Sequence, residues 1–315
     1  MVNWEMRRQL VKIANLYYNH NWTQEKIAKK FSVSRPVISK YLQKAKEIGI
    51  IQVYINDKTY HTVNLEETIE KKFNLEDVLV VPSVSDSEEE VINAVAKAGA
   101  NYIAKNLNNI KSLGISWGKT LASLVREFPY EAREEIKIVP LEGGMGRKQV
   151  EIHANQLAYE LSNKVGGDCA YLYVPAIVES KELYDRLIGM EDIDLVLKEG
   201  EKVDTALISI GNPYEESTLE RLGYIQQEDK EIMKHKGVTG DLGFRFFDKN
   251  GIPLHDILDK QVIGISLESL KNINRVIAVV CGEKKAESLL AALKGEFIDV
   301  LITDQKTANK IAKNK

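Results

Sequence analysis

The amino-acid sequence predicts an α/β protein in two parts. Residues 1–55 are expected to form a winged helix-turn-helix domain, and residues 65–315 a large doubly wound α/β domain. Three observations support this fold class. The length of 315 residues fits about two domains. The first part shows three short stretches of apolar residues at helical spacing. In the second part, continuous apolar runs alternate with helical patterns, which is typical of a parallel sheet covered on both faces.

The elements of the N-terminal part follow from spacing and capping. Apolar residues at helical spacing predict a first helix over about residues 5–19. A second short helix begins after Thr23, a good N-cap. A third begins after Ser34 and tolerates Pro36 because the first turn leaves its amide without a helical partner. Residues 50–55 are apolar and predict a strand, which would form a small wing.

The charge of this part differs sharply from the rest. Residues 1–55 hold ten basic and three acidic residues, a net charge of +7, so the remaining chain carries −10 of the total −3. A basic head on an acidic body suggests a polyanionic partner, although a solvated basic surface would have the same composition. The residues of the third helix opposite its apolar stripe are Arg35, Pro36, Ser39, Lys40, Gln43 and Lys44. Apart from Pro36, their polar side chains can reach bases or phosphates. A short helix, a turn and such a helix form the arrangement whose second helix enters the DNA major groove.

Residues 56–64 are polar and unpatterned and are expected to be a linker, after which residues 65–73 form a helix. The expected strands cover residues 78–82, 112–116, 136–141, 169–174, 204–210, 275–280 and 297–302. The expected helices cover residues 88–106, 117–127, 150–163, 190–199, 284–293 and 305–313. Ligands of such sheets bind at the carboxyl ends of the strands, so the loops after the strands are the candidate site.

The loop after the second strand spans residues 114–120 and nearly matches two enzyme motifs. A hydrolase with a Gly-x-Ser-x-Gly elbow needs a late histidine, whereas His255 is followed by sixty residues and two predicted strands. A P-loop needs Gly-x4-Gly-Lys-Thr, and here the first glycine, Gly114, is one residue too close. Both enzyme classes are therefore disfavoured. The hydroxyls of Ser116 and Thr120, with Gly118 at a helix N-terminus, instead suit an anion such as phosphate.

Two further loops are rich in glycine. Gly143 and Gly144 let the backbone approach a ligand closely, although they also fit a plain turn. Glu151 and Asn155 stand one helical turn apart on the following helix and could face the same ligand. Gly211 ends another strand and has the same two interpretations.

Charged side chains complete the candidate site. Asp241, between two glycines and a run of aromatic residues, can accept hydrogen bonds from sugar hydroxyls. Arg245 can contact the ligand or be an internal ion-pair partner. Lys285 lies at a helix start after an apolar strand and is a natural phosphate anchor.

These motifs resemble a known family. Residues 23–28 and 33–42 resemble the helix-turn-helix of the SorC family of bacterial sugar-responsive transcriptional regulators. The segment 114–120, the Gly143-Gly144 loop, the segment 240–248 and the helix start at Lys285 resemble the effector domain of that family. The resemblance covers nearly the whole chain in the right order.

The resemblance implies a body similar to ribose-5-phosphate isomerases and glucosamine-6-phosphate deaminases. It implies operator DNA and a phosphorylated sugar as partners, and a homo-oligomer, either a dimer or a tetramer. The expected DNA-contacting residues are Thr23, Gln24, Ser34, Arg35, Pro36, Ser39, Lys40, Gln43 and Lys44. The expected effector-binding residues are Ser116, Gly118, Thr120, Gly143, Gly144, Glu151, Asn155, Gly211, Asp241, Arg245 and Lys285.

Composition narrows the class of protein further. The N-terminus lacks the apolar run of a signal peptide, and no window approaches the ~20 apolar residues of a membrane span. Cys169 and Cys281 lie in strand-like runs, which is a reduced cytoplasmic usage. We therefore expect a cytoplasmic protein without membrane association, catalytic residues, cofactor or metal.

The sequence thus predicts a DNA-binding regulator, a repressor in mechanism, controlled by a sugar phosphate. The alternative is a sugar-phosphate isomerase or deaminase fused to a DNA-binding domain. Its carboxylates would be Glu142, Glu151 and Asp241, among which the sequence shows no evident acid–base pair. A purely structural nucleoid protein is disfavoured because it would have no use for the large ligand-type domain.

Overall fold

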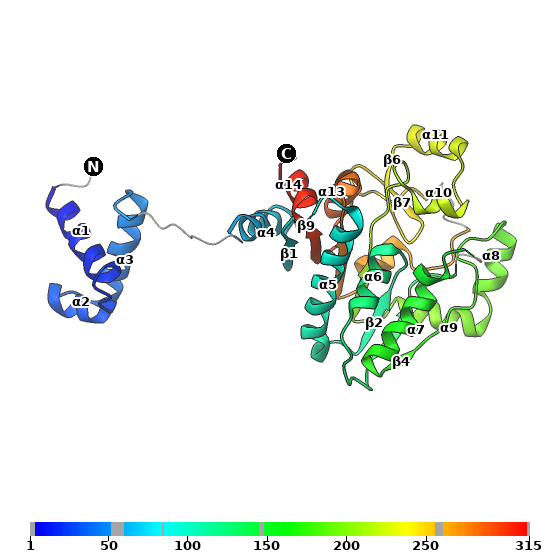
Figure 1. Cartoon of the computed structure of the whole chain (residues 1–315), viewed down its shortest axis with the longest axis horizontal. Coiled ribbons are helices and arrows are strands. Elements are labelled where there is room, and N and C mark those ends of the chain that lie inside the picture. Colours follow the sequence, from blue (N-terminus) through cyan, green and yellow to red (C-terminus); the bar gives the residue numbers. More distant parts are fainter. Residues whose placement is uncertain (1–3, 52–59, 84, 145–147, 256–260, 314–315) are drawn as a thin grey trace. The chain divides into compact units, whose positions relative to one another are not determined.

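The computed structural model describes residues 4–51, 60–83, 85–144, 148–255, 261–313. The chain divides into two compact units, Met1–Tyr60 and His61–Lys315 (Figure 1). No helix among the described residues is long and apolar enough to span a bilayer.

The smaller unit contains the three expected helices, α1 (Trp4–Tyr18), α2 (Gln24–Phe31) and α3 (Arg35–Glu47). Their apolar stripes meet in one small core around Ile13, Ile27 and Ile38. The Thr23 hydroxyl accepts a hydrogen bond from the amide of Lys26 at 3.2 Å, which confirms the predicted cap. Ser34 occupies the N-cap position of α3, but its side chain makes no capping hydrogen bond.

The end of this unit tests the predicted wing only in part. Ile50 and Ile51 are not in a strand, and residues 52–55 lie outside the described residues, as do residues 56–59 of the expected linker. Helix α4 (Tyr60–Phe73) begins five residues before the predicted start and includes residues 60–64 of that linker. Thr62 extends the stripe of Leu65 and Ile69 by one turn, and all three are buried. The sequence did not reveal this turn, because a buried threonine does not add to an apolar pattern.

The larger unit is built on a seven-stranded sheet in the order β1-β9-β8-β5-β2-β3-β4. All pairs are parallel, as the continuous apolar runs predict. The strands are β1 (Asp77–Val81), β2 (Ser112–Ile115), β3 (Lys137–Pro140), β4 (Asp168–Cys169), β5 (Thr205–Ile208), β8 (Arg275–Val280) and β9 (Val300–Asp304).

Helices cover both faces of the sheet (Figure 1). In β8, Ile277 and Val279 face one apolar core, while Val276 and Val280 face the other. The first core is shared with α5 (Glu88–Asn106), α6 (Lys119–Glu127) and α7 (Ala154–Val165). The second core is shared with α4, α12 (Leu267–Lys271), α13 (Ala286–Lys294) and α14 (Gln305–Lys313). Helix α9 (Glu191–Gly200) packs near the second core through Val196.

The expected strand over residues 169–174 is wrong in length. Only Asp168 and Cys169 pair with β3 in β4. The Asn155 side chain donates to the Leu172 carbonyl at 2.9 Å and accepts from the Leu172 amide at 2.8 Å. One side chain thereby supplies the hydrogen bonds that a neighbouring strand would supply, and the chain leaves the sheet.

Several short elements have no counterpart in the predicted pattern. They are the helices α8 (Lys181–Ile188), α10 (Thr218–Leu222), α11 (Gln227–His235) and α12, the hairpin strands β6 (Val238–Leu242) and β7 (Arg245–Asp248), and the 3₁₀ turn at Leu107–Asn109. Most lie between β5 and β8, where the sequence mixes charge, glycine and aromatic residues and hides the periodicity. The 3₁₀ turns at Val150–Ile152 and Glu283–Lys285 lie at the starts of the expected helices 150–163 and 284–293.

The topology marks one position as the natural ligand crevice. The chain passes from β2 to β3 on one side of β2, but from β5 to β8 on the opposite side. The strand order therefore reverses between β2 and β5, and ligands of open α/β sheets bind at such a switch point, beyond the carboxyl ends of the strands.

Candidate functional site

The smaller unit exposes the polar face predicted for its third helix. The residues exposed there are Ser34, Arg35, Pro36, Ser39, Lys40, Gln43 and Lys44. In α2 and its cap, Thr23 is exposed and Gln24 is half-buried. The buried stripe of α3, which includes Ile38 and Leu42, occupies the opposite side.

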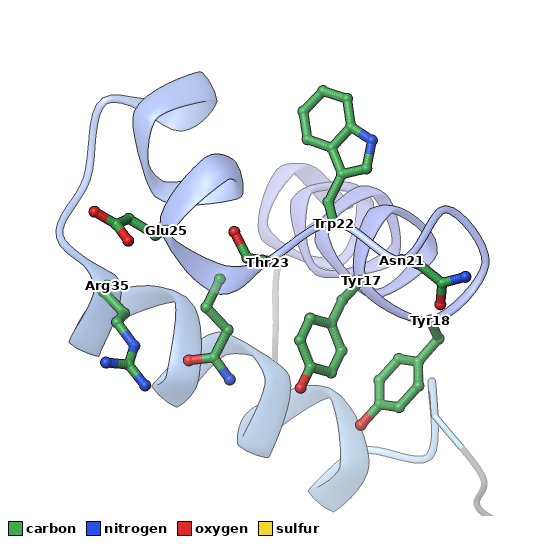
Figure 2. A pocket seen from close by; sticks show the side chains of 8 residues that line it. Tyr17, Tyr18, Asn21, Trp22, Thr23, Glu25 and Arg35 are labelled. Atoms are coloured by element: carbon green, nitrogen blue, oxygen red, sulfur yellow. The ribbon is translucent and has the colours of Figure 1, made fainter.

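A pocket of about 560 Å³ joins the two helices of this unit that the sequence singled out. Figure 2 shows its lining, which consists of Tyr17, Tyr18, Asn21, Trp22, Thr23, Gln24, Glu25 and Arg35. The N-terminus of α2 and Arg35, at the start of α3, line the same pocket. Sequence reasoning missed Trp22, whose ring lies 4.1 Å from the Lys26 ammonium and 5.0 Å from that of Lys30. An aromatic residue followed by lysines one and two helical turns later was the available signal.

In the larger unit, the predicted loops converge at the switch point. Ser116 follows β2, Glu142 follows β3 and Gly211 follows β5. The Ser116 amide donates to the Leu207 carbonyl at 3.0 Å, and Gly211 pairs with Asp241 of the β6–β7 hairpin. These four residues therefore come from distant segments to one region.

Glu142 is the most deeply buried carboxyl group of this region, with 1% of its surface exposed. Its Oε1 accepts hydrogen bonds from the Ser116 hydroxyl and the Trp117 amide, both at 2.8 Å. Burial raises the pKa of Glu142 to about 8, and the nearby Asp241 carboxylate contributes to the increase. The Ser116 hydroxyl is thus bound to a carboxyl group rather than to an imidazole, which agrees with the rejection of a hydrolase.

Asp241 is the second buried carboxyl group. Its amide and carbonyl pair with Gly211 at 3.3 and 2.9 Å. A Cβ atom at position 211 would lie 1.9 Å from the Asp241 Oδ1, so only glycine fits there. Burial raises the pKa of Asp241 to about 6, whereas the positive charge of Lys285 lowers it. Lys285, which is half-buried, therefore lies near enough to interact electrostatically with Asp241.

The loops after β2 and β8 meet beside this carboxyl pair. The Thr120 hydroxyl lies 3.9 Å from the Cys281 sulfur. Gly118 and Gly282 have φ angles of +131° and +101°, which L side chains rarely adopt. Each glycine precedes a helical start, at Lys119 and at Glu283, so two sets of amides and lysines lie close together.

Of the remaining predicted residues, Gly143, Gly144 and Asn155 make hydrogen bonds to the backbone of neighbouring segments. The Gly143 amide donates to Ile263 and the Gly144 amide to Val174, and a Cβ at Gly143 would lie 2.6 Å from the Val174 carbonyl. This close backbone packing explains Gly143, whereas a Cβ at Gly144 would lie at an ordinary contact distance of 3.9 Å from the Val174 carbonyl. Glu151 is exposed, while Asn155 binds the backbone of Leu172 with both ends of its amide.

Arg245 resolves the alternative that the sequence left open. It is buried and donates to the carbonyls of Val262 at 3.0 Å, Gly264 at 3.2 Å and Ile265 at 3.4 Å. The same segment pairs with Glu142 through Gly264. Arg245 therefore acts as an internal partner whose hydrogen bonds to these carbonyls hold the segment next to Glu142.

Sequence reasoning assigned Glu142 only to the alternative enzyme and missed the aromatic wall beside it. Trp117 stacks on Phe244 with ring centroids 5.0 Å apart, and Phe244 lies in the β6–β7 turn with a φ of +68°. The position of Glu142, directly after an apolar strand and before two glycines, was the signal that could have identified it.

This arrangement combines two kinds of recognition. The carboxyl groups of Glu142 and Asp241 can exchange hydrogen bonds with hydroxyl groups, and a stacked aromatic pair provides an apolar wall. Lysines and helix-start amides next to them suit an anionic group. Within the described ranges, no cluster of three or more His, Cys, Asp or Glu side chains is arranged to hold a metal ion.

Known proteins resemble this chain in both sequence and fold. Residues 57–313 match the family Sugar-bind, described as "Putative sugar-binding domain". The chain is 28% identical to the deoxyribonucleoside regulator of Bacillus subtilis (strain 168) over 307 residues, or 98% of each protein. It superimposes on the full-length sorbitol operon regulator SorC from Klebsiella pneumoniae with a TM-score of 0.76 and 28% identity, covering 97% of this chain and 98% of that one.

A DeoR-family transcriptional regulator from Listeria monocytogenes is 41% identical with a TM-score of 0.75, covering 79% of this chain and 99% of that one. The family match spans most of the chain, and the likeness to the full-length SorC structure includes both units. The chain therefore belongs to the SorC family of transcriptional regulators, which carry a sugar-binding domain.

Proposed function

We propose that this protein is a cytoplasmic repressor of carbohydrate-metabolism genes whose affinity for operator DNA is set by a phosphorylated sugar. The observation that carries this proposal is the juxtaposition of buried Asp241 with Lys285 at the switch point. A carboxylate that can accept hydrogen bonds from hydroxyls and a lysine that can bind phosphate are the two groups that a sugar phosphate requires.

The geometry suggests how the ligand would be divided between these groups. Asp241, with Glu142 and Ser116 behind it, would bind the hydroxyls. Lys285, with the amide and hydroxyl of Thr120, would bind the phosphate, because charge-assisted hydrogen bonds are stronger than neutral ones. Gly118, whose amide donates to the Ile152 carbonyl at 3.0 Å, would shape the loop that places Thr120 there. Gly143, Gly144, Gly211, Asn155 and Arg245 would fix the walls through the backbone contacts described above, and exposed Glu151 would lie at the rim.

The smaller unit would bind DNA as a helix-turn-helix. Its exposed face of arginine, lysine, glutamine and serine on α3 matches the donors and acceptors of the major groove. Thr23 and Gln24 at the start of α2 would contact the phosphate backbone, and the pocket beside Arg35 would take part of the strand.

Regulation requires that the two units communicate. We infer a head over residues 1–55, a linker, and a body over residues 65–315 similar to ribose-5-phosphate isomerases and glucosamine-6-phosphate deaminases. A homo-oligomer, a dimer or a tetramer, would place two heads on two DNA half-sites. The effector would favour one arrangement of the oligomer, and it can shift that equilibrium only by its differential affinity for the two states.

The test is a Lys285→Ala variant of the full chain. Operator affinity is measured by fluorescence anisotropy with and without a panel of sugar phosphates. We expect the variant to bind the operator like the wild type and to lose the effector response, because Lys285 supplies the charge that anchors the phosphate. A variant that still responds at normal effector concentrations would show that the anchor is elsewhere.

The alternative function is a sugar-phosphate isomerase or deaminase. The raised pKa values of Glu142 and Asp241 favour it, because acids and bases that titrate near neutrality suit proton transfer. The named relatives of the chain are regulators, so the enzyme is the less favoured function. Turnover of any member of the same panel that disappears in an Asp241→Ala variant would reverse this order.

A further inference from the structure

Four cationic side chains gather beside the proposed phosphate position, and we call them the cationic rim. They are Lys119 at the start of α6, Arg221 of α10, and Lys284 and Lys285 of the 3₁₀ turn before α13. Lys284 and Lys285 are consecutive in this turn, and Lys284 pairs with Glu216. Burial and the charges of Arg221 and Lys285 lower the pKa of Lys119, while the charge of Glu216 raises it.

One carboxylate of the chain already occupies this rim. Glu216 forms an ion pair with Lys284. The Lys284 hydrogen bond lowers the pKa of Glu216, and the charge of Arg221 lowers it further. A second acidic residue, Glu88 at the start of α5, also interacts with this cluster. Glu216 is therefore the internal counter-ion that pairs directly with a lysine of the rim.

Hydrogen bonds hold the loop that carries Glu216 against both Asp241 and Lys284. It begins at Gly211, which pairs with Asp241, and Asn212 donates from its amide to the Lys284 carbonyl at 2.6 Å. Asn212 also accepts from the amides of Tyr214 and Glu215 at 2.9 and 3.3 Å. The backbone of Lys284 and its side chain are thus both held by the same loop.

The backbone at Glu216 departs from ordinary geometry. Its φ is +53°, a left-handed conformation that is uncommon for residues other than glycine, asparagine and aspartate. Such outliers cost free energy and persist where the surrounding structure imposes them, often at ligand sites and switches. The loop therefore presents this carboxylate in a conformation that glutamate does not favour.

We propose that Lys284 is a second ligand of the effector's anionic group, and that Glu216 holds it in a self-inhibited contact until the effector arrives. This inference rests on the proposed function and adds how the site is regulated. A phosphate carries up to two charges and three strong acceptor oxygens, so it displaces the single carboxylate of Glu216 from Lys284. The contact raises the effector concentration at which the regulator responds.

The experiment measures binding of inorganic phosphate to the full chain by isothermal titration calorimetry at pH 7.5 and constant ionic strength. We expect Glu216→Gln to bind phosphate about three- to fivefold more tightly than the wild type, as for the stronger exposed ion pairs. The matched control is Glu215→Gln, which removes the same charge from the neighbouring exposed position and is expected to change affinity by less than about 1.5-fold.

A double-mutant cycle tests whether Glu216 acts through Lys284. We expect the gain from Glu216→Gln to disappear in a Lys284→Gln background. Equal effects of Glu216→Gln and Glu215→Gln, or a gain that persists without Lys284, would overturn the inference.

Lys285→Ala separates this inference from the proposed function. Loss of phosphate binding in Lys285→Ala without any gain in Glu216→Gln overturns only the self-inhibited contact. Phosphate binding that is unchanged in Lys285→Ala overturns the proposed function as well.

Discussion

Replacing Glu142 with glutamine should stabilise the larger unit increasingly as the pH rises. Burial raises the pKa of Glu142 from 4.5 to about 8 in the folded state. Between these values the folded chain binds a proton that the unfolded chain has released, so the stability of the wild type falls as the pH rises. Glutamine is always neutral, and its amide oxygen can still accept the hydrogen bonds from Ser116 and Trp117.

The size of this effect follows from the same shift. Between pH 5.5 and pH 7.5 the wild type loses about 1.4 kcal/mol of stability for each pH unit, or about 3 kcal/mol in total. The raised pKa of Asp241 makes stability depend on pH mainly below pH 6, and it does so in both the wild type and Glu142→Gln. For a unit of this size, 1 kcal/mol shifts the melting temperature by about 2–4 °C. The advantage of Glu142→Gln should therefore grow by about 6–12 °C over this interval.

The assay is thermal unfolding of the ligand-free chain in phosphate-free buffers from pH 5.5 to pH 8.5. Exposed Glu151 gives the control variant Glu151→Gln, whose melting temperature should follow the wild type. A constant difference between Glu142→Gln and the wild type across this range would refute the reasoning, because it would mean that Glu142 is ionised in the folded protein.

Two further predictions concern the DNA-facing helix and the support of the site. Arg35→Ala and Gln43→Ala should each weaken operator binding by about 1–3 kcal/mol without lowering the melting temperature, as measured by anisotropy titrations. Arg35→Ala should also reduce the slope of log affinity against log salt by about 1 if Arg35 contacts a phosphate, and unchanged affinity in both variants would exclude α3 as the reading helix. Arg245→Met should lower the stability of the larger unit by about 3 kcal/mol, because it removes the guanidinium that donates to the carbonyls of Val262, Gly264 and Ile265. Calorimetry measures the melting temperatures of Arg245→Met and of the control Arg126→Met, which alters an exposed arginine. Equal melting temperatures of the two variants would contradict the structural role of Arg245.

The sequence alone determined the parallel sheet, its main helices and the three-helix head. Strands such as β8, buried on both faces, are runs of apolar residues that contrast clearly with the amphipathic helices around them. The short elements between β5 and β8 were missed because they are too short to produce a clear periodicity, in a segment that mixes charge, glycine and aromatic residues. Helix α10, for example, is capped by Ser217, which accepts from Glu220, and this local signal is too short to produce a periodicity.

The same distinction holds for the site. Residue type and position after a strand identified Ser116, Gly211 and Lys285 as candidates, since parallel strands bring their carboxyl ends to one edge. Asp241 was identified by its place in a segment rich in glycine, charge and aromatic residues. Only the tertiary structure decided which side chains could remain available to a ligand. Arg245 and Asn155 make their hydrogen bonds to backbone groups far along the chain, and Glu142 titrates near neutral pH because the fold removes it from water. Desolvation and long-range hydrogen bonding depend on neighbours that the linear sequence does not place together.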